Sequence, residues 1–358
     1  MLKLLLWAVA VAGCCVAQNK VGIANRSFTV DGPYEWRAAK THALNVIVWY
    51  PASSDSVEAP QWLGPPNAPV QSAGSAAPDA TLAANPGRFP LIALSHGTGG
   101  AAIQMAWLGT YLASHGFIAV AVNHPGNNFI DGYTIQGFSI WWERARDIIV
   151  VIDRMLADPT FGNRIDARRI GAAGFSLGGY TMIELAGGIT EREALIRFCA
   201  SPKRDAICKP LPEMPDAAAK SAELERDDPQ YRAALSNSGK PYRDPRIRAV
   251  FAIAPAIGQA FPPKNLAGIH IPVDIVAGAA DDICPVATNA EYFAKHIHGA
   301  RVTILPGGVS HYTFLNDCTD QGRKVVHPFC DDAPGVNRAA VHVKVASMAV
   351  SFFEARFK

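Results

Sequence analysis

A serine flanked by glycines is the feature of this sequence that most directly indicates chemistry. Residues 174–178 read Gly-Phe-Ser-Leu-Gly, follow a strand-like run at 169–173 and precede a helix-forming stretch. This order is typical of a nucleophile elbow, whose tight turn holds the serine hydroxyl out of the sheet. A hydroxyl becomes nucleophilic when a base removes its proton. We therefore predict Ser176 as a nucleophile, with Gly174 and Gly178 letting neighbouring backbones pack closely; a simple glycine-rich turn is the alternative.

A carboxylate is expected after a later strand, because the partners of an elbow serine follow in the order acid and then base. Residues 271–278 are typical of a buried strand, and Asp281 and Asp282 occupy the turn directly after it. The preceding strand, at 247–253, has no carboxylate in the loop that follows it. We assign the acid to Asp281 and keep Asp282 as the alternative, since an error of one residue in the turn exchanges them.

Five of the ten histidines lie beyond these aspartates, and only His311 follows a strand pattern through a short glycine-bearing loop. The strand pattern covers 301–305 and the loop covers 306–310. His296 and His298 end a helical pattern, where a histidine usually caps the helix. We therefore predict His311 as the general base, with an ordinary turn histidine as the alternative.

An oxyanion hole needs the amide after the nucleophile and a second amide from a loop that follows an earlier strand. Residues 91–95 are typical of that strand, and 96–100 read His-Gly-Thr-Gly-Gly. We expect the amides of Thr98 and Leu177 to be the donors and His96 to be a structural hydrogen-bonding residue. The same glycines imitate a dinucleotide-binding fingerprint, but no acidic residue follows about twenty positions later to bind a ribose.

Five segments carry a resemblance to known proteins: Ser-His-Gly-Thr-Gly at 95–99, residues 112–124, the elbow at 174–179, the acid loop at 278–285, and Ser-His-Tyr-Thr-Phe-Leu at 310–315. Together they resemble the plasma-type platelet-activating-factor acetylhydrolases and the allied bacterial "predicted dienelactone hydrolase" proteins, over most of residues 40–315. The resemblance implies an α/β-hydrolase fold and a carboxylic ester hydrolase that uses Ser176, Asp281 and His311. True dienelactone hydrolases carry a cysteine nucleophile, so the resemblance supports ester hydrolysis without naming a substrate.

The length and composition of the chain are those expected of one large globular domain. The 358 residues, 49% apolar and 18% charged, are enough to bury one large core. The net charge is +2, without a basic cluster, so no nucleic-acid partner is expected. No Cys-x-x-Cys or His-Glu-x-x-His spacing occurs, so we predict no metal and no other cofactor. The expected partner is a small-molecule or lipid ester.

Strand and helix patterns alternate through residue 305, which predicts a mostly parallel sheet with helices on both faces. Residues 51–90, rich in alanine, proline and serine, are expected to be an exposed excursion. The pattern at 141–156 predicts an amphipathic helix with Glu143 off its apolar face. The pattern breaks at about 189–246, which predicts a lid-like insertion over the site or, alternatively, a surface excursion.

Residues 1–17 have the layout of a secretory signal: a thin positive start, an apolar stretch and then small residues. The stretch is too short to span a bilayer. Cleavage after Ala17 would release a soluble hydrolase domain at 18–358 into the periplasm or the medium. Residues 11–14 also resemble a lipobox, which would leave Cys14 lipidated and the protein attached to a membrane. An uncleaved core helix is the remaining alternative.

Export would permit disulfides among the cysteines beyond the signal. The pairs nearest in sequence, Cys199 with Cys208 and Cys318 with Cys330, would each close a short loop and leave Cys284 unpaired. Connectivity does not follow from a sequence, so these pairs are a hypothesis.

Two-step acyl transfer is the predicted mechanism: His311 deprotonates Ser176, the serine attacks the ester carbonyl, Asp281 orients the histidine, and water cleaves the acyl-enzyme. The alternative enzyme is a phospholipid acylhydrolase of the platelet-activating-factor acetylhydrolase type at a membrane surface, which lipidation of Cys14 would favour. The alternative of another class is a hydrolase-like binding protein without chemistry.

Overall fold

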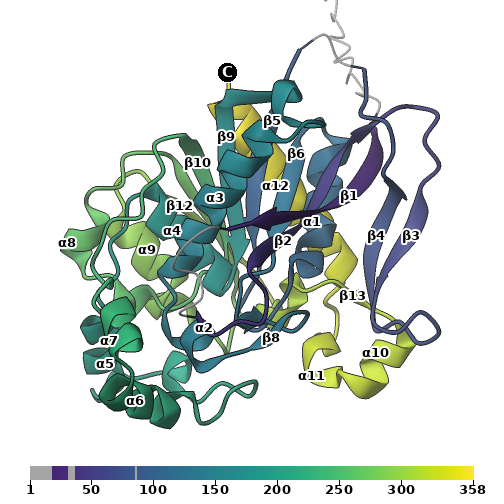
Figure 1. Ribbon diagram of the computed structural model, residues 1–358. Helices are drawn as coiled ribbons and strands as arrows, with labels where there is room; N and C mark the ends of the chain where they lie inside the picture. Colours follow the sequence, from purple (N-terminus) through teal and green to yellow (C-terminus); the bar gives the residue numbers. More distant parts are fainter. Residues whose placement is uncertain (1–17, 31–36, 85–86) are drawn as a thin grey trace, which may run out of the picture.

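A computed structural model describes residues 18–30, 37–84 and 87–358 (Figure 1). The predicted signal at 1–17, including the lipobox and Cys14, lies outside the described residues. Among the helices of the described part, none combines the length and the apolar character needed to cross a bilayer.

A central sheet runs through the molecule (Figure 1). Its strands, in spatial order within the described residues, are β12 (Arg301–Leu305), β11 (Val273–Gly278), β10 (Ile247–Ile253), β9 (Ile165–Phe175), β5 (Phe89–Ser95), β6 (Ile118–Val122), β2 (Ala43–Ala52), β1 (Lys20–Thr29), β4 (Gln71–Pro78) and β13 (Asp317–Cys318). The run from β12 to β6 is parallel, and β2 pairs antiparallel with β6 and β1. β3 (Ala59–Leu63) pairs with β4, and β7 (Asn127–Asn128) forms a separate ribbon with β8 (Gly132–Tyr133). The predicted, mostly parallel sheet is confirmed.

Helices cover both faces of this sheet. Alternate residues of β5 belong to opposite hydrophobic clusters, with Leu91 and Ala93 in one and Ile92 and Leu94 in the other. The first cluster is covered by α3 (Glu143–Ala157), α4 (Leu177–Ala186) and α9 (Ala290–His296), and the second by α1 (Ala106–Ser114) and α12 (Arg338–Arg356). Figure 1 shows α3 and α4 on one side of the sheet and α12 on the other. Burial on both faces explains why these strands are continuous apolar runs.

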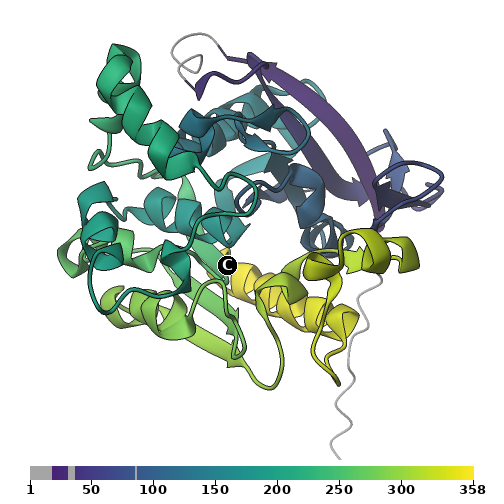
Figure 2. The same cartoon turned by 90° about the horizontal axis from the view of Figure 1, so that it is seen from below.

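The remaining helices lie at the ends of the sheet and in the 189–246 segment. They are α2 (Ile135–Ser139), α5 (Arg192–Cys199), α6 (Ala217–Asp227), α7 (Pro229–Leu235), α8 (Pro263–Leu266), α10 (Asp320–Val325) and α11 (His327–Cys330), with the 3₁₀ turns η2 (Ala102–Met105), η3 (Gly162–Arg164), η4 (Ala206–Cys208), η5 (Gly258–Ala260), η6 (Val286–Thr288) and η7 (His311–Phe314). Figures 1 and 2 show α5, α6 and α7 on the opposite side of the molecule from α10 and α11.

Two disulfides close short loops at these two sides. Cys199 bonds Cys208, which ties α5 to η4, and Cys318 bonds Cys330, which ties β13 to α11. Cys284 is a free, buried thiol. Both predicted pairs are confirmed.

The prediction that residues 51–90 form an exposed excursion is confirmed at 53–70, where no residue is buried, and wrong at β4. The segment contains β3 and β4, and Ala73 and Ala76 of β4 have no exposed surface. β4 pairs with β1, β3 and β13, and Gly74 lies against Thr110 of α1. Small side chains let β4 approach α1 closely, so tertiary pairing overrides the weak strand preference of alanine and serine.

Glu143, which the helical pattern places off the apolar face of α3, is fully buried. Its Oε1 accepts hydrogen bonds from the Tyr242 hydroxyl at 3.0 Å and from Asn237 Nδ2 at 3.2 Å, and its Oε2 accepts one from Arg146 Nη1 at 2.8 Å. The 189–246 segment therefore packs over the polar side of α3, and its contacts replace water around Glu143.

Candidate active site

Ser176 occupies the turn between β9 and α4 with a backbone conformation that a residue with a side chain rarely adopts. Its φ is +57° and its ψ is −120°. Strain of this kind persists only where the surroundings hold it. Here the Ser176 amide donates to Ile253 O at 2.9 Å, and the Ser176 carbonyl accepts from Ala256 N at 3.1 Å. β10 and the loop after it thus fix the elbow against the strain.

The glycines on either side of Ser176 fit where no side chain can. A Cβ on Gly178 would overlap the carbonyl oxygen of Ser95, and a Cβ on Gly174 would overlap the carbonyl oxygen of Gly178. Both positions therefore require glycine, because the neighbouring backbones approach too closely to leave room for a side chain.

We expect Gly178→Ala to destabilise the fold by about 1–3 kcal/mol, because the added methyl must push β5 away from α4. The same shift should lower the rate at which Ser176 reacts with an ester at least about tenfold, since it displaces both the serine and the loop after β5. Urea unfolding and p-nitrophenyl acetate hydrolysis measure the two effects. Gly268→Ala is the matched control, because its Cβ would meet only Gly187 O at 3.9 Å. Equal stability and activity in the two variants would contradict the steric argument.

The structure brings the predicted serine, histidine and aspartate together. His311 begins η7, directly after β12 and its glycine loop. Its Nε2 lies 2.9 Å from Ser176 Oγ, and its Nδ1 lies 2.8 Å from Asp281 Oδ2. Asp282, the alternative acid, is exposed. The Asp281 carboxylate acceptor implies that Nδ1 carries the proton, which leaves Nε2 free to accept one from the serine.

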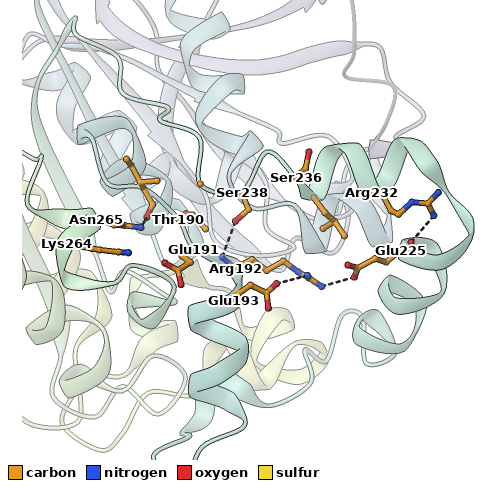
Figure 3. A pocket seen from close by; sticks show the side chains of 13 residues that line it. Thr190, Glu191, Arg192, Glu193, Glu225, Arg232, Ser236, Ser238, Lys264 and Asn265 are labelled. Carbon is orange, nitrogen blue, oxygen red and sulfur yellow. Dashed lines mark hydrogen bonds and ion pairs between the residues drawn. The ribbon is translucent and has the colours of Figure 1, made fainter.

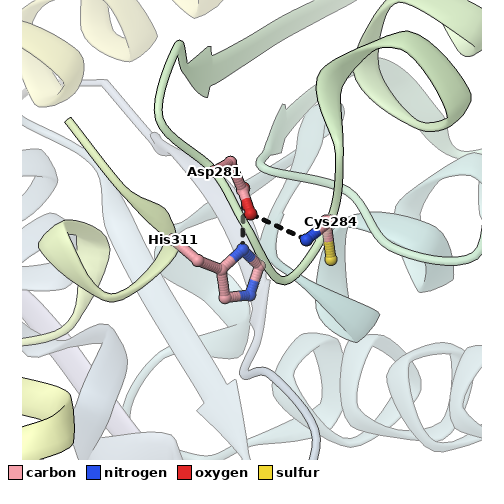
Figure 4. A group of neighbouring side chains, drawn as sticks. All are labelled: Asp281, Cys284 and His311. Carbon is pink, nitrogen blue, oxygen red and sulfur yellow. Dashed lines mark hydrogen bonds and ion pairs between the residues drawn. The ribbon is translucent and has the colours of Figure 1, made fainter. Parts of the chain in front are cut away.

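Asp281 is itself held by the turn that follows it. Its Oδ1 accepts hydrogen bonds from the amides of Ile283 at 3.1 Å and Cys284 at 2.7 Å. Figure 4 shows the carboxylate between the Cys284 amide and the His311 ring. The Cys284 sulfur, an Asp281 oxygen and a His311 nitrogen all lie within 4.8 Å of one another. Such a set of sulfur, oxygen and nitrogen atoms could hold a zinc ion. The spacing of cysteines and histidines along the chain does not indicate this group, because His311 lies 27 residues beyond Cys284.

Burial and charge act in opposite directions on His311. Burial lowers the pKa of the imidazole, but the charges of Cys284 and Asp281, and hydrogen bonds to both, outweigh it and raise the pKa above 6.5. Burial raises the pKa of the Cys284 thiol. Near pH 7 the thiol is therefore neutral and its charge acts only at higher pH, so at pH 7 the Asp281 carboxylate is the charge that favours protonated His311.

We expect kcat/KM for an ester to rise with pH through a midpoint above 6.5, because His311 accepts the serine proton only when it is neutral. Asp281→Asn removes the charge that favours the protonated ring, so its lower residual activity should titrate at a lower pH. Burial lowers the pKa of His311, but the neighbouring charges raise it to about 10, so profiles between about pH 5 and 11 measure this. Asp282→Asn is the control and should keep the wild-type midpoint. A shift in that control, with none in Asp281→Asn, would show that the acid is Asp282.

The loop after β5 lies against Ser176. A Cβ on Gly97 would be 3.2 Å from Ser176 Cβ. The amides of Thr98 and Leu177 have no hydrogen-bond acceptor within residues 18–30, 37–84 and 87–358. Both predicted donors are thus available to a ligand. His96 hydrogen-bonds the Gly97 carbonyl through Nδ1 at 2.7 Å and accepts from His124 N at 3.3 Å.

A second serine, histidine and aspartate lie in hydrogen-bond order beneath this loop. His124 Nε2 is 2.8 Å from Ser95 Oγ, and His124 Nδ1 is 2.8 Å from Asp147 Oδ2. All three residues are fully buried. Burial, and then the charge of Arg144, lower the pKa of His124 well below 6.5, so the ring is neutral. Since no substrate reaches Ser95, this trio has a structural role.

Arg144 connects that trio to the oxyanion loop. Its Nη1 donates to Asn127 Oδ1 at 2.8 Å, and its Nη2 donates to Ser95 Oγ at 3.2 Å and to the His96 carbonyl. Asn127 Oδ1 also accepts from Gly99 N at 3.1 Å. Burial lowers the pKa of Arg144 to about 9, although Asp147 opposes this, and the side chain stays charged at neutral pH. The sequence analysis did not single out Arg144. Its position could have indicated burial, because Arg144 precedes the apolar Ile148 by four residues and so lies on the same buried face of α3.

A charged cavity of about 730 Å³ opens elsewhere, between the loop after α4, α5 and α7 (Figure 3). Arg192 lies in its wall and forms ion pairs with Glu193 at 3.2 Å and Glu225 at 3.1 Å. Its lining includes none of Ser176, Asp281 and His311, so we assign this cavity no part in the chemistry of those residues.

Comparison with known proteins points to esterases. The family model described as "PETase: PET hydrolase-like" matches residues 79–201, about a third of the chain, from the oxyanion loop through the elbow. "Cutinase est1" of Thermobifida alba is 36% identical over 110 residues, which cover 30% of this chain and 34% of the cutinase. "Lipase 1" of Moraxella sp. (strain TA144) is 35% identical over 92 residues, 26% of this chain and 25% of the lipase. The chain thus spans about a third of the cutinase and a quarter of the lipase.

A solved structure resembles the whole molecule. The ferulic acid esterase of Streptomyces cinnamoneus superposes with a TM-score of 0.62 at 20% identity, and the match covers 94% of this chain and 90% of that one. The fold is that of an α/β-hydrolase. The similarities support an esterase group within this fold, and none of them singles out the acetylhydrolase subgroup that the sequence motifs resemble.

Proposed function

We propose that this protein is a serine carboxylic ester hydrolase that works through an acyl-enzyme. The observation that carries the proposal is the unbroken line of hydrogen bonds from Asp281 through His311 to the Ser176 hydroxyl. In the first step His311 takes the serine proton as the serine oxygen attacks the ester carbonyl, and Asp281 stabilises the charged imidazole. Local similarity to cutinases and a lipase supports esters as the substrate class.

The oxyanion that forms in this step needs donors that are already in place. The proposed donors are the amides of Thr98 and Leu177, each of which contributes roughly 3 kcal/mol in comparable sites. His311 then protonates the departing alcohol. In the second step it activates a water that cleaves the acyl-enzyme, so the cycle requires no cofactor.

Small or lipid-like esters are the proposed substrates, with a phospholipid of the platelet-activating-factor type as the second candidate. Residues 189–246 would act as a lid, since Glu213 of this segment reaches Gly99 of the oxyanion loop. Two disulfides favour an exported protein, with the signal at 1–17 removed and Cys14 as the lipid anchor if the lipobox is used.

One assay series tests the proposal. The protein is offered p-nitrophenyl esters of increasing acyl length, a short-chain phospholipid and a polyester film, and a fluorophosphonate probe is mapped by peptide mass. We expect hydrolysis in at least one arm and the label on Ser176. Inactivity in every arm without labelling would instead favour a hydrolase-like binding protein.

A further inference from the structure

Three side chains from separate segments converge over Gly99 in the oxyanion loop. A Cβ built on Gly99 would lie 3.2 Å from Glu213 Cγ, 3.3 Å from the Tyr133 hydroxyl and 3.6 Å from Phe138 Cζ. Tyr133 also donates to the Gly99 carbonyl at 2.8 Å, and its ring packs edge-on against Phe138. The Glu213 side chain, from the 189–246 segment, therefore lies close to an aromatic pair.

This cluster lies beside the nucleophile. Gly97, two residues before Gly99, approaches Ser176 Cβ to 3.2 Å when its own Cβ is built. Two residues of chain span at most about 7 Å. Groups that touch Gly99 are thus within reach of a substituent a few atoms beyond an ester bound at Ser176.

Glu213 also acts on the residue after the catalytic histidine. Burial and then the Glu213 charge raise the pKa of Tyr133, and in the same order they raise the pKa of Tyr312 to about 12. Tyr312 packs edge-on against the His311 ring. The carboxylate thus influences phenols near both the oxyanion loop and the histidine.

Within the described part of the chain, the Glu213 carboxylate has no cationic partner and accepts no hydrogen bond. Glu213 is half-buried, and Tyr133 keeps 37% of its surface exposed. Partial burial strengthens the attraction between an unpaired carboxylate and a cation. Aromatic faces add attraction for a quaternary ammonium.

We propose that Glu213, Tyr133 and Phe138, which lie around Gly99, form a subsite for a cationic, quaternary ammonium group of the ester substrate. The inference rests on the proposed esterase function and deepens it by naming a substrate class. The same carboxylate repels esters that carry a carboxylate near the scissile bond. In this proposal Glu213 contacts the substrate but takes no proton in the reaction. Its replacement should therefore change KM and leave kcat nearly unchanged.

The test compares acetylcholine with 3,3-dimethylbutyl acetate, an ester of the same shape without the charge. In the wild type we expect kcat/KM for acetylcholine to exceed that for the neutral ester by about three- to tenfold. The difference should arise from a lower KM for acetylcholine. Glu213→Gln should bring the ratio close to one while hydrolysis of the neutral ester persists. Glu223→Gln, which removes the same charge from the exposed side of α6, should keep the wild-type ratio. An equal ratio in wild type and Glu213→Gln overturns the proposal.

Hydrolysis of the neutral ester reports separately on the proposed esterase function. Binding to Ser176→Ala tests the subsite without turnover, by calorimetric titration with choline and with 3,3-dimethylbutan-1-ol. Tighter choline binding that is lost when Glu213→Gln is added supports the subsite even if no ester is cleaved. Equal binding of the two alcohols refutes it.

Discussion

Replacing Ser176 with alanine is expected to lower kcat for ester hydrolysis by about six orders of magnitude, whereas Ser95→Ala should retain most of the activity. Both hydroxyls lie within 3 Å of a histidine nitrogen whose ring also meets an aspartate. They differ in surroundings. Ser176 stands on a strained turn near the Thr98 and Leu177 amides, which find no acceptor in the described part of the chain, while Ser95 ends a buried strand and accepts a hydrogen bond from Arg144.

Kinetics and fluorophosphonate labelling of both variants measure this difference. Ser176→Ala should melt like the wild type and lose the label. Ser95→Ala should keep the label and lose about 1–3 kcal/mol of stability, because it leaves a guanidinium donor and an imidazole acceptor partly unpaired. Residual labelling of Ser176→Ala, or loss of labelling in Ser95→Ala, would reverse the roles of the two serines.

Arg144→Met is expected to destabilise the protein by about 3–5 kcal/mol, because it removes one member of a buried charge network and leaves its partners behind. Asp147 keeps the hydrogen bonds from Arg37, but the His96 carbonyl, Asn127 and Ser95 each lose a donor. For a domain of this size the melting temperature should fall by roughly 10 °C.

The same substitution should lower kcat about tenfold to a hundredfold at temperatures where the variant is folded, with KM little changed. The reason is that Arg144 and Asn127 hold Gly99 and His96 on either side of the proposed Thr98 donor, and a displaced donor loses transition-state stabilisation. Arg154→Met is the control on the same helix, where an exposed guanidinium donates to Thr29 O. An unstable Arg144→Met with wild-type kcat would restrict Arg144 to a role in stability.

Local patterns were enough to predict the elbow, the acid turn and the histidine loop. Each is a short segment at the end of a strand, and the parallel order of β9, β10, β11 and β12 then brings Ser176, Asp281 and His311 to one edge. The disulfides were also within reach of the sequence, because each partner is the nearest cysteine along the chain.

Contacts between distant segments were not predictable in the same way. β4 is a strand because β1 and β13 pair with it, and its alanines and serines carry little strand preference of their own. The burial of Glu143 could not be read from the helical pattern, because its partners, Tyr242 and Asn237, follow 99 and 94 residues later. Glu213 has no local pattern at all, since its place over Gly99 depends on how the 189–246 segment folds back.

The order of the reacting groups along the chain affects when the protein becomes reactive. His311 follows Ser176 by 135 residues, and a ribosome adding 5–20 residues per second needs roughly ten seconds to cover that distance. During this interval the elbow serine exists without its base, and its hydroxyl is no more reactive than that of free serine. On the mechanism proposed above, ester hydrolysis therefore begins only once β11 and β12 have joined the sheet and placed Asp281 and His311 beside the serine.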